Sequence, residues 1–141
     1  MSGQTIATAP AATPARPVTA RGATALKVSI GLQTAALFFQ AGTAGALLVS
    51  PTGALLHDIG SRVMYGATML YLPAAVLAWR PGGGTPRPIL YATGFLVLAS
   101  VQVVLGIAHL PAFHVPLGVT LCALSVLDLA RVLTGGTRPA R

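Results

Sequence analysis

Two histidines in this chain have the type and the position to build a chemical site. His57 opens the second of four apolar segments, and His114 opens the fourth. Imidazole is a common metal ligand, and it also gains or loses a proton near neutral pH. The third histidine, His109, lies two residues before Pro111, in the turn between the last two segments. The spacing therefore predicts a site formed by the two histidines that begin alternate segments.

The composition indicates a membrane protein. Of the 141 residues, 54% are hydrophobic and only 8% are charged, whereas a soluble domain carries about a quarter charged residues. The formal net charge is +7, but the basic residues flank the apolar segments, which is the pattern of topology signals rather than of a nucleic-acid-binding face. One cysteine, Cys122, excludes a disulfide within the chain. We expect the lipid bilayer as a partner, and no nucleic acid.

The apolar segments predict an all-α, polytopic membrane protein with an up-down four-helix transmembrane bundle. A span needs about 20 apolar residues. The four predicted spans are residues 28–50, 57–79, 88–110 and 114–133. Together they form a bundle over residues 25–134, between a disordered tail at 1–24 and a short tail at 135–141. Pro111 is expected to end the third helix.

The basic residues predict the orientation of this bundle. Arg62 lies on one side of a four-span topology, and the other basic residues lie on the opposite side. These others are Arg16, Arg21, Lys27, Arg80, Arg87, Arg131, Arg138 and Arg141. The positive-inside rule then places both termini in the cytoplasm and the three histidines at the outer face. We expect a multi-pass protein of the plasma membrane.

This topology brings the two segment-opening histidines together. In an up-down bundle the second and fourth helices are parallel and diagonal, so His57 and His114 lie at similar depth and can face each other across the axis. Haem iron accepts axial imidazoles from both faces. The sequence therefore predicts a haem b with His57 and His114 as the axial ligands of its iron. Because a six-coordinate iron has no open position, the predicted role is electron transfer or haem handling. No catalytic residue is assigned; an enzyme built on this site would be a haem-dependent membrane oxidoreductase.

Small and polar residues near the histidines complete the predicted haem pocket. They are Gly60, Ser61 and Arg62 after His57, Gly118 after His114, and Gln40, Gln102 and Gly106 on the other two spans. The small residues leave room for a porphyrin edge, and the arginine is expected to meet a haem propionate. The two glutamines are expected to line the cavity or to bind each other.

Other interpretations remain open. The alternatives to the haem site are a cofactor-free structural or accessory membrane protein, and an outer-surface site for zinc or protons that adds Asp58 and His109. Asp128, within the last span, is an intramembrane acid. An ion pair with Arg131, three residues further on, is the simplest account of it, and proton transfer is the alternative. A redox partner or quinone and a homodimer are further open possibilities.

The pattern resembles one half of haem A synthase. The residues that carry the resemblance are His57, the run Gln-Val-Val-Leu-Gly at 102–106, and His114. Each half of that family is a four-helix bundle with a histidine pair on its second and fourth helices, facing outward. Over residues 30–133, the resemblance implies this fold and a haem-b site at His57 and His114. The chain also resembles small four-span membrane proteins of actinobacteria with the same two histidines.

The chain departs from haem A synthase in three ways. The glutamate that precedes the histidine of the catalytic half is missing, because residues 52–56 read Thr-Gly-Ala-Leu-Leu and Asp58 follows the histidine instead. The outer cysteine pair of many of those enzymes is absent, and there is one bundle rather than two. The resemblance therefore implies haem binding, but not the oxidation of a haem methyl group.

Overall fold

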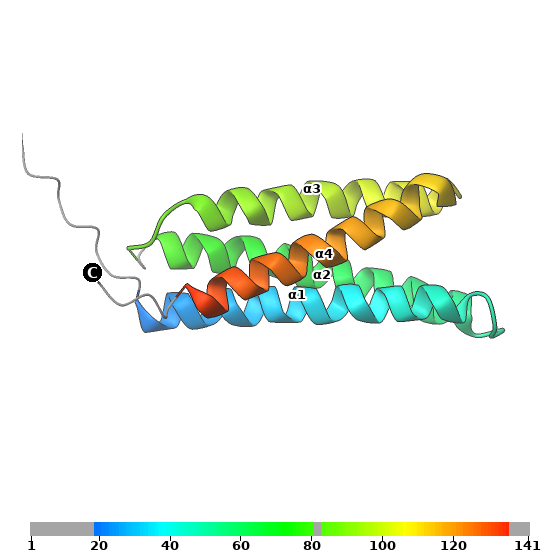
Figure 1. Ribbon diagram of the computed structural model, residues 1–141, viewed down its shortest axis with the longest axis horizontal. Coiled ribbons are helices and arrows are strands. Elements are labelled where there is room, and N and C mark those ends of the chain that lie inside the picture. The colour runs from blue at the N-terminus through cyan, green and yellow to red at the C-terminus, as the bar shows by residue number, and fades with distance from the viewer. Residues whose placement is uncertain (1–18, 81–82, 136–141) are drawn as a thin grey trace, which may run out of the picture.

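The computed structural model describes residues 19–80 and 83–135, and the regular elements in these residues are four α-helices. They are α1 (Ala20–Ala46), α2 (Gly53–Trp79), α3 (Arg87–Ile107) and α4 (Pro111–Thr134). Consecutive helices run in opposite directions, and α4 also packs against α1 (Figure 1). This arrangement leaves α2 and α4 parallel and diagonal to each other. The prediction of an all-α protein is confirmed.

The two ends of the bundle differ in chemistry. One end, the arginine end, holds the start of α1, the end of α2, the start of α3 and the end of α4. Its basic residues are Arg21, Arg80, Arg87 and Arg131. The opposite end, the histidine end, holds the turns at residues 47–52 and 108–110. Apart from Arg62 of α2, the basic residues of the described chain therefore lie toward the end away from the histidines, as the positive-inside rule describes.

Three helices, α1, α3 and α4, are long and apolar enough to cross a membrane. Large apolar side chains point outward along all four helices; Leu90 and Phe113, for example, are 70% and 66% exposed. Such an outer surface suits lipid better than water. α2 is as long as α1, at 27 residues, but it carries Asp58 and Arg62 in its first half. The chain therefore has the character of a membrane protein.

The first helix begins earlier than the predicted span. α1 starts at Ala20, within the region predicted to be a disordered tail. Thr19 caps it, because its hydroxyl oxygen accepts a hydrogen bond from the Gly22 amide at 3.3 Å, which satisfies one of the free N–H groups of the first turn. The rest of that predicted tail, residues 1–18, and residues 136–141 of the second tail lie outside the described residues.

The turn between α3 and α4 differs from the prediction. α3 ends at Ile107, and Pro111 begins α4 instead of ending α3. Proline fits the first position of a helix because the N–H that it lacks would have no partner there. His109 makes the turn with a positive φ of 51°, a left-handed conformation that few residue types other than glycine adopt. His109 therefore has a conformational role in this turn.

The tightest helix packing lies between α1 and α2. Near the arginine end, a Cβ on Gly22 would lie 3.0 Å from the Cα of Ala78. At the other end, Gly53 begins α2 directly against the carbonyl of Ala46, with no room for a side chain. The largest fully buried apolar side chains of the described core are Ile30, Met64, Tyr71 and Leu121. Glycines at both ends thus let α1 and α2 stay in contact along their whole length.

α4 changes its neighbour along its length. In its middle, Ser125 is hydrogen-bonded to Thr34 of α1 at 2.5 Å. Near its start, His114 is bonded to Gln102 of α3. The α1–α2 and α3–α4 hairpins therefore diverge toward the histidine end (Figure 1).

Candidate functional site

The structure brings the two segment-opening histidines together. His57 is the fifth residue of α2, and His114 is the fourth residue of α4. Their ring centroids are 6.2 Å apart, and the ring planes are inclined by 70°. Both residues are half-buried. Because α2 and α4 are diagonal, the two imidazoles reach across the bundle axis between the diverging hairpins.

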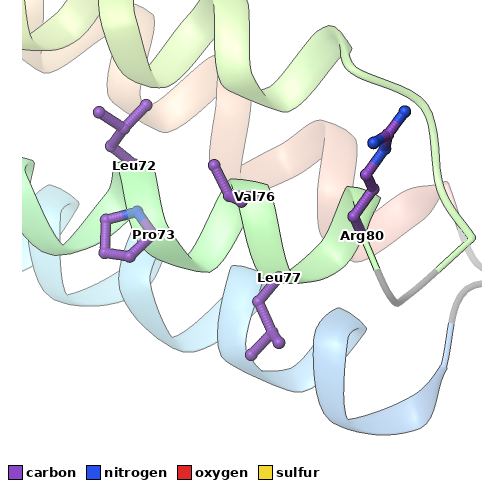
Figure 2. Close-up of a pocket in the computed structure, with 5 residues that line it drawn as sticks. All are labelled: Leu72, Pro73, Val76, Leu77 and Arg80. Atoms are coloured by element: carbon purple, nitrogen blue, oxygen red, sulfur yellow. The ribbon is translucent and has the colours of Figure 1, made fainter.

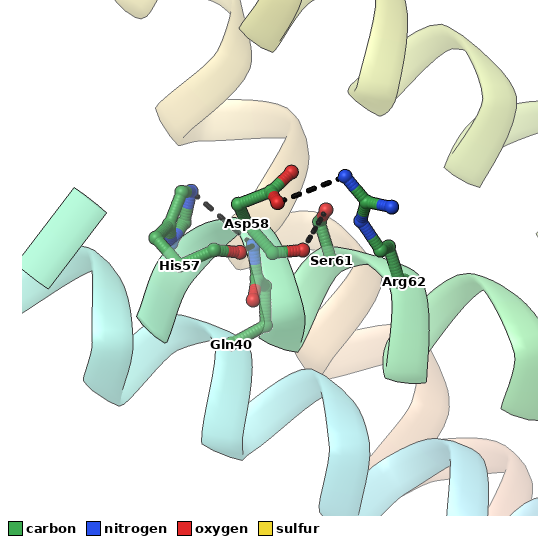
Figure 3. Close-up of polar contacts among 5 residues, drawn as sticks. All are labelled: Gln40, His57, Asp58, Ser61 and Arg62. Carbon is green, nitrogen blue, oxygen red and sulfur yellow. Dashed lines mark hydrogen bonds and ion pairs between the residues drawn. The ribbon is translucent and has the colours of Figure 1, made fainter. Parts of the chain in front are cut away.

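The His57 ring is held by two side chains of α1. Its Nδ1 lies 3.2 Å from the hydroxyl of Thr43, which donates its own proton to the Gln40 carbonyl at 2.9 Å. The hydroxyl must therefore accept from His57, so Nδ1 carries the ring proton. The Gln40 amide nitrogen lies 3.2 Å from His57 Nε2 (Figure 3) and donates to it. The lone pair of His57 is therefore on Nε2.

The His114 ring is held by the backbone of α3. Its Nδ1 lies 2.9 Å from the carbonyl oxygen of Gln102. A carbonyl can only accept, so Nδ1 of His114 also carries the proton and Nε2 keeps the lone pair. The two histidines thus share one tautomer, and each is oriented by the helix that precedes its own.

The two glutamines of the predicted pocket have matching roles. The Gln40 amide donates to the His57 carbonyl at 3.1 Å, and the Gln102 amide donates to the His114 carbonyl at 2.9 Å. Each glutamine thus binds the histidine of its own hairpin, and the two do not bind each other. Gln102 Oε1 is buried and has no hydrogen-bond partner among the described residues.

The predicted glycines do not leave open space. Gly60 lies directly against the Gln40 side-chain oxygen, and a Cβ on Gly118 would lie 2.9 Å from the Gln102 amide nitrogen. In this structure a glutamine side chain therefore lies at each of these glycines, and the expectation that they give room to a porphyrin edge stays a prediction. Their small size instead lets each glutamine reach the histidine carbonyl one turn earlier.

The remaining predicted residues are placed as follows. Gly106 faces the His114 ring, because a Cβ there would lie 3.1 Å from its Cε1 atom. The Ser61 hydroxyl donates to the Asp58 carbonyl at 2.7 Å. Arg62 pairs with the Asp58 carboxylate at 3.0 Å, with both side chains largely exposed (Figure 3). Ser61 and Arg62 therefore lie beside the histidine pair and make no recorded contact with either ring.

The described residues do not form the zinc site that the sequence left open as an alternative. Within residues 19–80 and 83–135, no three histidine, cysteine, aspartate or glutamate side chains come together. His109 is exposed in its turn, and Asp58 is bound to Arg62. Among the described residues at this end, His57 and His114 are the two histidines whose rings lie in contact, edge to face.

The sequence reasoning missed the partner of Asp128. The Tyr71 hydroxyl donates to the Asp128 carboxylate at 2.6 Å across the bundle. Arg131, the expected ion-pair partner, lies instead over the ring of Tyr91, 5.6 Å from its centroid. The sequence contained one indication of this contact, because Tyr71 follows His57 by 14 residues and Asp128 follows His114 by 14 residues.

The bundle also has a hollow on the outside of α2, near the arginine end. Its lining is Leu72, Pro73, Val76, Leu77 and Arg80 (Figure 2). Ligand sites combine an apolar wall with several convergent polar groups, whereas here a single cation adjoins aliphatic side chains. The candidate functional site is therefore the histidine pair and not this hollow.

No family model, no curated protein and no solved structure matches this chain. The resemblance to haem A synthase therefore stays a prediction.

Proposed function

We propose that this protein is an integral membrane, cytochrome-like protein that binds haem b, with His57 and His114 as the two axial ligands. The spacing of the rings carries the proposal. A metal–imidazole bond is about 2 Å long, so two imidazoles on opposite faces of one metal ion have ring centroids about 6 Å apart. The centroids of His57 and His114 are 6.2 Å apart.

The tautomers support the same assignment. A histidine that binds a metal usually donates its other ring N–H to a protein acceptor, which fixes the ring. His57 and His114 both do so, to the Thr43 hydroxyl and to the Gln102 carbonyl. Both keep an Nε2 lone pair for a metal. At His57, the Gln40 amide has to release Nε2, and its second bond to the His57 carbonyl holds it close by.

Haem iron between two imidazoles supplies one-electron chemistry and has no open position for a substrate. The residues of this chain hold the two rings level and fix their tautomers. The α1–α2 and α3–α4 hairpins diverge toward the histidine end (Figure 1), and we propose that the macrocycle would lie between them. These features favour electron transfer or haem handling, with a redox protein or a quinone as the partner.

We further propose that α2 is a fourth membrane span and that both termini lie in the cytoplasm of a plasma-membrane protein. α2 packs antiparallel against α1 along its whole length, so it crosses the bilayer if α1 does. In a Cys122→Ser background, cysteines at Thr52 and at Thr85 test this arrangement. An impermeant maleimide added to intact cells should label position 52 and leave position 85 unlabelled until the cells are opened. Equal labelling of both positions in intact cells would contradict the topology.

The haem assignment is tested by absorption of the purified, detergent-solubilised protein after incubation with haem. The wild type should show a Soret band and, on reduction, the sharp bands of a six-coordinate iron. His57→Ala and His114→Ala should each lose that spectrum. His109→Asn is the matched control, because asparagine tolerates the left-handed turn, and it should keep the wild-type spectrum.

Two results would overturn the assignment. One is a wild-type protein that folds but shows no Soret band when haem is supplied. The other is a wild-type spectrum in both alanine variants. Either result would leave the histidine pair as a brace between the hairpins of a cofactor-free accessory membrane protein. That second function has one observation in its favour: in this structure both ring nitrogens of His57 have protein partners.

A further inference from the structure

α2 and α4 face each other through residues that recur at seven-residue intervals, which we call the α2–α4 seam. Its members are His57, Met64 and Tyr71 on α2, and His114, Leu121 and Asp128 on α4. The seam makes polar contacts at both ends, and the two contacts lie 14 residues apart, about 21 Å along a helix. Met64 and Leu121, both buried, lie between them. The Tyr71–Asp128 contact is therefore separate from the histidine pair.

Asp128 is an acid enclosed by the bundle. It is 4% exposed, and its partner Tyr71 is 1% exposed. The phenol donates one neutral hydrogen bond to the carboxyl group, at 2.6 Å. α4 is one of the helices apolar enough to cross a membrane, and an ionised carboxylate within a membrane protein needs a counter-charge or several donors.

No ion pair to this carboxyl group is seen among the described residues, and the charge of Arg131, three residues further along α4, acts on it only from a distance. Arg131, on the same helix, lies over the ring of Tyr91, which α3 contributes. From α2 the group receives Tyr71. The basic residues of α1, Arg21 and Lys27, are exposed. Among residues 19–80 and 83–135, the recorded ion pair is that of Arg62 and Asp58.

A second observation points to a small polar ligand in this part of the bundle. Gln33 of α1 is 0% exposed, and neither polar atom of its side chain has a hydrogen-bond partner among the described residues. It precedes Thr34 in α1, whose hydroxyl is bonded to Ser125, three residues before Asp128 on α4. Among the described residues no hydrogen bond joins Gln33 directly to Asp128. A buried amide in native proteins almost always has a partner, and buried water is the usual one when protein groups do not supply it.

We propose that Asp128, Tyr71 and Gln33 form a proton-binding site in the arginine half of the bundle. Asp128 takes up one proton to become a neutral carboxylic acid, and releases it to become a carboxylate. Tyr71 holds one carboxyl oxygen, and water at the Gln33 amide relays the proton to and from the group. The ligand is a proton delivered by water, and the site works without the histidine pair.

Infrared spectroscopy of the full-length protein in lipid bilayers tests this site directly. At neutral pH, the wild type should show the C=O stretch of a protonated carboxyl group, and the band should shift in D2O within the time of buffer exchange. Asp128→Asn should lose this band, whereas Asp58→Asn, the matched control, should keep it. Tyr71→Phe should move it to higher frequency, because one hydrogen bond to the group is lost. Gln33→Leu should keep the band but slow its shift in D2O at least several-fold.

Three outcomes would overturn the proposal: a wild type without the band, a band that survives Asp128→Asn, or a band that does not shift in D2O. The first two would show that Asp128 does not hold the proton. The third would show a sealed structural hydrogen bond. Because the measurement needs no haem, its result is independent of the test of His57 and His114.

Discussion

The two polar contacts of the α2–α4 seam occupy equivalent places on the same two helices, but their surroundings are opposite. The His57–His114 pair is half-buried between diverging hairpins. The Tyr71–Asp128 pair is almost completely buried, and it lies where α1 and α4 are still joined by Thr34. The arginine half is therefore the more completely buried, closed half of the bundle, and the histidine half is the less completely buried, open half.

The physical reason is helix spacing. In the arginine half the seam is flanked by small residues, such as Ala75 and Ala78, and these are buried against the neighbouring helices. At the histidine end, the glutamines lie over Gly60 and Gly118 and fill the space with amides that can rotate. Packed aliphatic cores resist change, whereas polar side chains on rotatable bonds can exchange partners. The comparison therefore predicts where the bundle is sensitive to mutation and where it is tolerant.

The largest effect is expected from Tyr71→Ala. This side chain is the largest of the fully buried ones, and truncating a buried aromatic residue costs about 3–5 kcal/mol. His57→Ala, at the equivalent place in the open half, should cost less than about 1.5 kcal/mol, because the ring is half-exposed. Reversible unfolding in mixed detergent–SDS micelles measures both. Equal losses would show that the two halves are packed alike.

Adding volume should show the same difference with a smaller effect. Ala75 is 0% exposed, and Ala75→Leu forces extra methylenes into a filled space, at a cost of about 1–3 kcal/mol. Ala54, in the first turn of the same helix, is exposed. Ala54→Leu should therefore change the unfolding free energy by less than about 0.5 kcal/mol. If position 75 accepted leucine without loss, the closed half would contain unrecognised space.

Much of this architecture could be predicted from the sequence. Long apolar segments separated by short turns gave the helices and their order, because hydrophobicity and length are local properties. The up-down topology then placed His57 level with His114, since in that topology two segment starts must lie at the same end. The predicted end of the third helix at Pro111 was wrong, because proline can either end a helix or begin one. The left-handed turn at His109 comes first, so Pro111 begins α4.

The structural details that the sequence did not reveal depend on contacts between helices. Gly60 and Gly118 indicated space, but which side chain fills that space is decided by Gln40 and Gln102 on other helices. For Asp128, local spacing favoured a pair with the cation three residues on, and the true partner lies across the bundle. Contacts between distant helices leave no local pattern in the sequence. The one indication of this contact was the repeated 14-residue spacing from each histidine.

Three glycines differ in what lies at their Cβ positions. Gly60→Ala and Gly118→Ala place a methyl group against a glutamine amide, so each should displace one glutamine and cost about 1 kcal/mol for the lost hydrogen bond. Gly66, in the middle of α2, has open space at its Cβ position. Gly66→Ala should stabilise by up to about 1 kcal/mol through helix propensity. The same unfolding assay measures all three, and a stabilising Gly60→Ala would contradict the role given to Gln40.

The smallest effect is expected at Asp58. Its ion pair with Arg62 has the favourable i,i+4 spacing, but the side chains of Asp58 and Arg62 are 56% and 78% exposed. Exposed pairs of this kind contribute about 0.3–0.5 kcal/mol, so Asp58→Asn should change the unfolding free energy by no more than that.

The same substitution releases Arg62 for an anionic ligand. If the arginine meets a haem propionate, Asp58→Asn should retain or modestly raise haem affinity in an absorption titration, whereas Arg62→Gln should lower it severalfold. A loss of more than about 1.5 kcal/mol on Asp58→Asn would mean that this pair is part of the packed structure, and the open character of the histidine end would then have to be abandoned.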